Sequence, residues 1–174
     1  MSNINIKDIH IAIIGLGYVG LPLAIEFGKK RKVTGFDLDN KRINELKSGY
    51  DKTLEVSKSN LKKARYLDFT NNVLDLKKSN CFIVSVPTPV NSKKNPDFSY
   101  LVNACKIIGN CMTKQCVIIF ESTVYPGATE EICVPVLEKT SGLKYNKSFF
   151  CGYSPERINP GDKKHKITNI KKIT

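Results

Sequence analysis

The feature that most constrains the fold is a Gly-x-Gly-x-x-Gly pattern between a short apolar segment and a segment of helical character. Gly15 permits a tight turn, Gly17 lets the backbone approach a pyrophosphate without a Cβ in between, and Gly20 allows a helix to pack closely on a strand. The amino end of that helix offers unpaired N–H groups and a positive dipole to the phosphates, and Pro22 is tolerated in its first turn. The pattern therefore predicts a strand, a nucleotide-binding turn and a helix.

An acidic residue ends the next expected strand, residues 32–37. Asp37 lies about 20 residues beyond the glycines, where a carboxylate can accept hydrogen bonds from both ribose hydroxyls. Its charge would repel a 2′-phosphate, so we predict NAD as the cofactor in preference to NADP. Lys41 and Arg42 lie nearby and leave NADP as an alternative. In a second interpretation, the glycines serve only a turn and Asp37 only caps a helix.

Apolar runs alternate with segments of helical spacing, which predicts an α/β fold of one domain with a doubly wound parallel sheet, a Rossmann-type dinucleotide-binding domain. The chain has 174 residues and 41% apolar content, enough for a proper core. The expected strands cover residues 11–14, 32–37, 81–86 and 115–120, with a further strand that begins at 148–151. The expected helices follow the glycine pattern and cover residues 40–48, 56–65, 100–111 and 128–140.

Polar motifs follow the ends of these expected strands. In a parallel sheet the carboxyl ends of the strands line one crevice, where ligands bind, so the motifs are expected to converge on one site. Taken singly, each has a structural explanation as loop punctuation or a surface ion pair. Besides Gly15 and Asp37, the motifs are Pro87-Thr88-Pro89, Glu121-Ser122-Thr123 and Tyr153-Ser154-Pro155-Glu156-Arg157.

The formal net charge of +12 raises the question of a nucleic-acid partner. The positive charge is mostly lysine, scattered in pairs, and no basic stripe interleaved with aromatic residues is present. A solvated lysine-rich surface explains this pattern better than a nucleic-acid interface. We therefore expect no nucleic-acid partner, although the positive field can help to attract an anionic nucleotide.

Six cysteines without a C-x-x-C pair and only two histidines argue against a metal site. Cys81, Cys116 and Cys151 fall in apolar runs, which is typical of buried free thiols in a reducing compartment. No apolar run approaches the ~20 residues of a membrane span, and the amino terminus lacks the apolar core of a signal peptide. We therefore expect a cytoplasmic protein without a metal or a membrane partner.

Four segments together resemble the UDP-glucose/GDP-mannose dehydrogenase family over nearly the whole chain. They are Gly15-Leu-Gly-Tyr-Val-Gly-Leu-Pro, Val86-Pro-Thr-Pro, Glu121-Ser-Thr-Val-Tyr-Pro-Gly and Gly152-Tyr-Ser-Pro-Glu-Arg-Ile-Asn-Pro-Gly-Asp. The last segment is most similar to the branch that oxidises UDP-N-acetylhexosamines for surface polysaccharides. In the UDP-glucose branch a second glutamate falls where this chain has Pro160.

The resemblance implies a four-electron oxidation of the sugar C6 hydroxyl to a carboxylate, with two NAD⁺ used in succession through a cysteine-bound intermediate. It implies catalytic roles for Thr123, which would help to position a water, and for Glu156. Glu156, Arg157 and Ile158 would contact the UDP-sugar substrate. The cofactor would contact Gly15, Gly17, Tyr18, Val19, Gly20, Asp37, Arg42, Pro87, Thr88 and Thr123.

Family members are more than twice as long as this chain. The resemblance therefore implies that residues 1–174 form a truncated NAD-binding domain that lacks its last strand, the central helix and the carboxyl-terminal UDP-sugar domain. The full-length form would be a homodimer. None of the six cysteines stands in the sequence context of the family's nucleophile, so we expect the chain alone to be inactive. A stand-alone dinucleotide-binding module without turnover is the alternative.

Overall fold

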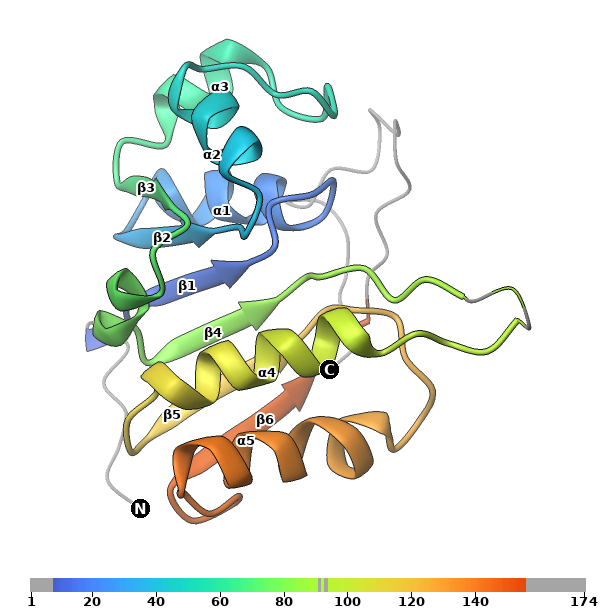
Figure 1. Ribbon diagram of the computed structural model, residues 1–174. Helices are drawn as coiled ribbons and strands as arrows, with labels where there is room; N and C mark the ends of the chain where they lie inside the picture. The colour runs from blue at the N-terminus through green and yellow to red at the C-terminus, as the bar shows by residue number, and fades with distance from the viewer. Residues whose placement is uncertain (1–7, 91, 93, 156–174) are drawn as a thin grey trace.

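A six-stranded parallel sheet forms the centre of the molecule (Figure 1). The structure is a computed structural model, and it describes residues 8–90, 92 and 94–155. The strand order is β3-β2-β1-β4-β5-β6, and every neighbouring pair is parallel. This confirms the predicted doubly wound α/β fold. The strands are β1 (Ile11–Ile14), β2 (Val33–Phe36), β3 (Leu67–Thr70), β4 (Cys81–Val84), β5 (Cys116–Phe120) and β6 (Phe149–Tyr153).

Helices cover both faces of the sheet. Two of them, α4 and α5, lie on the face turned toward the viewer in Figure 1, and α1 lies on the other. The helices are α1 (Gly20–Gly28), α2 (Asn40–Lys47), α3 (Lys58–Lys63), α4 (Ser99–Cys111) and α5 (Val134–Ser141), with a 3-10 helix at Val73–Lys78 and a π-helical turn at Thr129–Cys133. In the described part of the chain, no helix has both the length and the apolar character to span a membrane.

The central strand β1 shows why the sequence needs helices on both sides. Ile11 and Ile13 pack with the residues of α1 and α2, whereas Ala12 and Ile14 pack with those of α4. All four are buried. Successive side chains of a strand point to opposite faces, so a continuous apolar run requires cover on both faces of the sheet.

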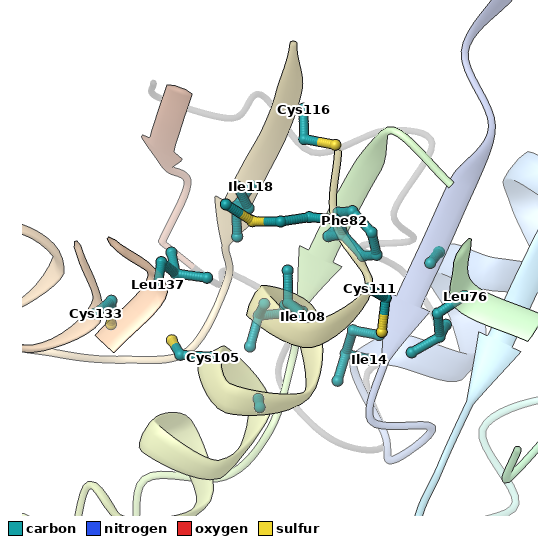
Figure 2. Close-up of a cluster of buried hydrophobic side chains, with 14 of the residues drawn as sticks. Ile14, Leu76, Phe82, Cys105, Ile108, Cys111, Cys116, Ile118, Cys133 and Leu137 are labelled. Carbon is teal, nitrogen blue, oxygen red and sulfur yellow. The ribbon is translucent and has the colours of Figure 1, made fainter. Parts of the chain in front are cut away.

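The larger of the two cores lies between the sheet and the pair α4 and α5. Figure 2 shows Phe82 and Ile118 from the strands close to Ile108 of α4, with Leu137 of α5 beside them. Each of these four side chains is fully buried. The core fixes α4 along the length of the central strands.

The direction of chain progression reverses between β1 and β4. From β1 the chain moves outward to β2 and β3, and then returns to place β4 on the other side of β1. In a sheet of this order the loops after the two central strands diverge and leave a crevice at the carboxyl ends. The expected strand-end motifs follow β1, β2, β4 and β5, as predicted, and the motif at the end of β6 is described only as far as Pro155.

Three elements differ from the sequence-based expectation, one of them the 3-10 helix at Val73–Lys78, which was not predicted. The strand β3 was not predicted, and its alternating but mostly half-exposed residues explain the weak signal. The helix expected over 128–140 is present and runs without a break over 128–141, but its first part is a π-helical turn, and Pro135 stands in the first turn of the α-helical part, α5. The expected absence of a last strand concerns chain beyond Thr174 and stays a prediction.

Candidate functional site

The glycine-rich turn joins β1 to α1 and has little room for side chains. Gly15 adopts a φ of +93°, which L-residues with a side chain rarely adopt. A Cβ built on Gly20 would lie 1.9 Å from the Gly15 carbonyl oxygen and 2.3 Å from Ser85 Oγ. A Cβ on Gly17 would meet no atom within 4 Å, so this position opens into free space. The motif therefore combines two sterically closed positions with one open position.

Side chains from the β2–α2 segment hold the peptide groups of Leu16, which lies inside the turn. Asp37 Oδ2 accepts a hydrogen bond of 2.8 Å from the Leu16 N–H, and Arg42 Nε donates one of 2.9 Å to the Leu16 carbonyl. Asp37 Oδ1 also accepts the Asp39 N–H at 3.0 Å. Each carboxylate oxygen has more than one lone pair, so Asp37 keeps capacity to accept a ribose hydroxyl.

Arg42 is buried behind the turn, with 3% of its surface exposed. Its Nη1 lies 2.8 Å from Asp51 Oδ1 in an ion pair. Burial acts to raise the pKa of Asp51, but hydrogen bonds from Thr53 and Val56 and the contact with Arg42 outweigh it and hold the pKa below its usual value. Asp51 is therefore a buried carboxylate, which compensates the charge of Arg42.

Hydroxyl groups tie the strand-end loops to one another. Ser85 Oγ, just after β4, donates to the Gly15 carbonyl at 2.9 Å. Ser122 Oγ, after β5, donates to the Val86 carbonyl at 2.6 Å. Thr88 Oγ1 donates to the Thr123 carbonyl at 2.6 Å in the opposite sense. The ends of β1, β4 and β5 are thus connected by side chains as well as by the sheet.

Two cavities open along this edge of the sheet. The first, of about 260 Å³, lies over the glycine turn and the ends of β4 and β5. The second, of about 330 Å³, lies between the end of β2 and α4. Both are lined by Gly15, Asp37, Val86 and Pro87, so they adjoin, and the two together are called the trough. The first is also lined by Leu16, Gly17, Tyr18, Val19, Ser85, Thr88, Glu121, Ser122 and Thr123, and the second by Ile14, Phe36, Leu38, Asp39, Tyr100, Asn103, Ala104 and Ile107.

The trough brings together most of the residues that the sequence analysis predicted to contact the cofactor. Gly15, Gly17, Tyr18, Val19, Asp37, Pro87, Thr88 and Thr123 all line it. Gly20 packs beneath it against Ser85, and Arg42 is buried behind it. Glu156, Arg157 and Ile158 lie outside the described residues, so their roles stay predictions.

Three contributions to the site were missed by sequence reasoning. Ser85 was not singled out, although its place directly after a buried strand was a usable signal. Tyr100 and Asn103 line the second cavity from α4, which carries no strand-end motif. Asp51 reaches Arg42 from a loop, and no spacing rule predicts that contact.

A dinucleotide fits this arrangement of residues. The closed and open glycine positions leave a cradle at the amino end of α1 that a side chain would fill, and the trough continues past Asp37. Among the described residues, no group of three or more His, Cys, Asp or Glu side chains is placed to hold a metal ion.

All six cysteines are free and lie among the described residues. Desolvation by burial raises the pKa of Cys81 to about 11 and that of Cys151 to about 12. A hydrogen bond with Cys133, together with burial, raises the pKa of Cys105 as well. The thiolate is the nucleophilic form, so these three thiols are poorly suited to covalent catalysis at neutral pH.

Comparisons with known proteins agree with this geometry. A family model described as "UDP-glucose/GDP-mannose dehydrogenase family, NAD binding domain" matches residues 9–174. A protein named UDP-N-acetyl-D-glucosamine 6-dehydrogenase from Pseudomonas aeruginosa is 61% identical over 168 residues, which are 97% of this chain and 40% of that protein. A protein of the same name from Salmonella typhi is 56% identical over 169 residues, again 97% of this chain and 40% of that protein.

A solved structure described as a UDP-D-ManNAc dehydrogenase from Pyrococcus horikoshii matches with a TM-score of 0.83 and 37% identity, and covers 88% of this chain and 37% of its own. A ternary complex of GDP-mannose dehydrogenase from Pseudomonas aeruginosa matches with a TM-score of 0.81 and 26% identity. This match covers 86% of this chain and 36% of the other chain. The chain spans about 40% of the length of the curated relatives that it matches. It belongs to the UDP-glucose/GDP-mannose dehydrogenase family and corresponds to the NAD-binding domain of that family.

Proposed function

We propose that the chain is the NAD-binding part of a 6-dehydrogenase that oxidises C6 of a UDP-N-acetylhexosamine to the uronic acid for surface polysaccharide synthesis. The observation that carries the proposal is the 61% identity, over 97% of the chain, to a protein named UDP-N-acetyl-D-glucosamine 6-dehydrogenase. The trough beside the glycine turn supports the cofactor part of the proposal. A cytoplasmic location, a UDP-sugar partner and a homodimeric full-length form belong to the same proposal.

The residues of the trough have separate tasks in this proposal. The apolar second cavity beside Tyr100 and Ala104 suits a base, and Asp37 would accept hydrogen bonds from the adjoining ribose. The backbone at Gly17 and the amino end of α1 would hold the pyrophosphate. The far end of the trough, at Thr123, would then hold the redox ring, and Arg42 would support the ribose end from behind the turn.

When bound, NAD⁺ supplies a hydride acceptor for the carbon that is oxidised. The loops after β4 and β5 would exclude water from one side of that reaction, because Ser122 and Thr88 tie the two loops together. Thr123 lies at the end of this clamp and would help to position the water required for the second oxidation. Glu156, Arg157 and Ile158 would contact the sugar or assist that water, as the family resemblance implies.

Reciprocal fusions test the substrate part of the proposal. The 174-residue chain would be joined to the carboxyl-terminal half of a UDP-N-acetylglucosamine 6-dehydrogenase and, separately, to that of a UDP-glucose dehydrogenase. NADH production would be compared for UDP-N-acetylglucosamine, UDP-N-acetylgalactosamine and UDP-glucose. A site shaped to pair an acetamido group leaves polar atoms unsatisfied when a hydroxyl replaces it. We expect a preference of roughly 5- to 150-fold in kcat/KM for the N-acetylated sugars in the first fusion.

Because the carboxyl-terminal half also contacts the sugar, the second fusion separates the two contributions. The preference of the second fusion for UDP-glucose would be compared with that of a complete UDP-glucose dehydrogenase. A smaller preference in the fusion would mean that this chain contributes part of the selectivity. Equal or faster turnover of UDP-glucose by the first fusion would contradict the assignment.

A further inference from the structure

A buried ion pair lies directly behind the glycine-rich turn. Arg42 comes from α2, and Asp51 comes from the segment between α2 and α3; their side chains are 4% and 0% exposed. Arg42 Nε donates to the Leu16 carbonyl at 2.9 Å, while Nη1 lies 2.8 Å from Asp51 Oδ1. The guanidinium group of Arg42 therefore connects the glycine-rich turn to the buried carboxylate of Asp51.

The carboxylate of Asp51 is itself held firmly. Its Oδ1 accepts the Thr53 N–H at 3.0 Å and the Thr53 hydroxyl at 2.7 Å, and its Oδ2 accepts the Val56 N–H at 2.9 Å. A buried carboxylate fixed on both oxygens offers the guanidinium one fixed opposite charge, which favours the orientation in which Nη1 faces Asp51. The planar fork of Arg42 can then present Nε to Leu16 without sampling other rotamers.

The Leu16 peptide is the point where this network meets the site. Leu16 stands between Gly15 and Gly17, and its carbonyl is fixed by Arg42 while its N–H is fixed by Asp37. The Nη1 and Nη2 atoms of Arg42 are buried and make no hydrogen bond among the described residues, so Nη1 meets Asp51 as an ion pair only. Arg42 lines neither cavity. Arg42 can thus influence a ligand in the trough through the backbone that it holds.

We infer that the buried pair of Arg42 and Asp51 positions the glycine-rich turn for the pyrophosphate of a dinucleotide, with Asp51 acting through Arg42 and the Leu16 carbonyl. The inference rests on the proposed binding of NAD at the turn. It assigns a positioning role to Asp51, which lies outside both cavities. A turn freed from this clamp would have to be ordered at the moment of binding, and that cost weakens affinity.

Asp51→Asn distinguishes positioning from simple electrostatics, because the two effects have opposite signs. Removal of a negative charge near an anionic ligand would by itself tighten binding. Loss of the positioned turn weakens it. We expect Asp51→Asn to bind NADH about tenfold more weakly, which corresponds to about 1.4 kcal/mol.

The measurement is a titration of the 174-residue chain with NADH, followed by cofactor fluorescence. The chain contains no tryptophan, so the emission of NADH is observed without an indole background. Asn80→Ala is the control: Asn80 joins the amino ends of β1 and β4, where it accepts from the His10 N–H at 2.9 Å and donates to the Asp8 carbonyl at 3.0 Å. This change removes two tertiary hydrogen bonds at the amino ends of the strands, on the side of the sheet opposite the trough. It should leave NADH affinity unchanged.

Arg42→Lys keeps the test decisive if Asp51→Asn does not fold. A lysine can still neutralise Asp51, but it lacks the fork that reaches Leu16 at the same time. We expect weaker NADH binding and, without cofactor, faster hydrogen exchange at the Leu16 and Gly17 amides than in wild type. A residue that only touched the cofactor would leave the exchange of the free protein unchanged.

The outcomes separate the two proposals. Absence of NADH binding by the wild-type chain would refute cofactor binding itself. Binding by wild type together with wild-type affinity in Asp51→Asn, or with wild-type affinity and amide exchange in Arg42→Lys, would refute the positioning role alone.

Discussion

Asp37 has two tasks at the residue scale, one within the protein and one toward the proposed cofactor. Its carboxylate accepts the backbone N–H groups of Leu16 and Asp39 and also lines both cavities. The sequence pattern predicted the second task from distance along the chain, but only the folded arrangement shows the first. A substitution that removes the carboxylate therefore affects both the turn and the ribose contact.

Asp37→Ala should weaken NADH binding by roughly 10- to 150-fold, because a charged hydrogen bond contributes about 1.5–3 kcal/mol. The discrimination against NADPH should shrink as well, since the charge that repels a 2′-phosphate is lost. Both affinities can be measured by fluorescence titration. Asp39→Asn is the charge control, because it removes a second negative charge from the cavity lining but keeps the side-chain oxygen that accepts the Lys41 N–H and caps α2. If Asp37→Ala bound both cofactors with unchanged affinity, Asp37 would make no ribose contact, and its hydrogen bond to the Leu16 N–H would not contribute to binding.

At the scale of elements, α4 and α5 approach one another closely over the front of the sheet. A Cβ on Gly109 of α4 would lie 2.7 Å from Thr140 Cβ and 3.1 Å from Thr140 Cγ2. Thr140 cannot easily turn away, because its hydroxyl donates to the Val136 carbonyl at 2.7 Å. The missing side chain thus sets the spacing of two helices, one of which lines the second cavity.

Gly109→Ala should lower the free energy of unfolding. Forcing a methyl group into this contact costs about 1–3 kcal/mol, which is offset in part by the gain of about 1 kcal/mol in helix propensity. Urea unfolding followed by circular dichroism gives the difference. Asn110→Ala, on the exposed side of the same helix, is the control and should not destabilise. Stabilisation of Gly109→Ala to the level of Asn110→Ala would contradict close contact between the helices.

The elements themselves show how far sequence reasoning reaches. The strands β1 and β4 were predicted because their sequences are continuously apolar. The structure accounts for that pattern, since both faces of these strands pack into a core. The strand β3 was not predicted, because Leu67-Asp68-Phe69-Thr70 is mostly exposed or half-exposed and lacks a continuous apolar run. The glycine turn was predicted from steric rules that act within a few residues. The contacts of Asp51 and of α4 depend on tertiary packing, so no local pattern contains them.

At the scale of the whole molecule, the described part of the chain combines a cofactor trough with thiols of low reactivity. The pKa values of Cys81, Cys105 and Cys151 are raised by burial, and for Cys105 first by its hydrogen bond with Cys133. A four-electron oxidation of the proposed kind needs a thiolate to hold the sugar between its two steps. Binding and turnover should therefore be separable in this chain.

The 174-residue chain alone should bind NADH but produce no measurable NADH from NAD⁺ and any of the three UDP-sugars. Absorbance of NADH provides the assay, and the fusion with a homologous carboxyl-terminal half is the positive control. Turnover by the chain alone that disappears in Cys81→Ser or Cys151→Ser would overturn this prediction. Turnover that survives every cysteine substitution would indicate a contaminating dehydrogenase.

Gly17 and Gly20 belong to one motif, but the space around the two positions differs. A side chain at position 20 collides with the protein's own backbone, whereas one at position 17 meets nothing in the described structure. If binding of a dinucleotide requires glycine at position 17, the requirement comes from the ligand and not from the fold. A descendant that no longer bound dinucleotides could therefore keep this architecture and Gly20 while position 17 accepted a side chain.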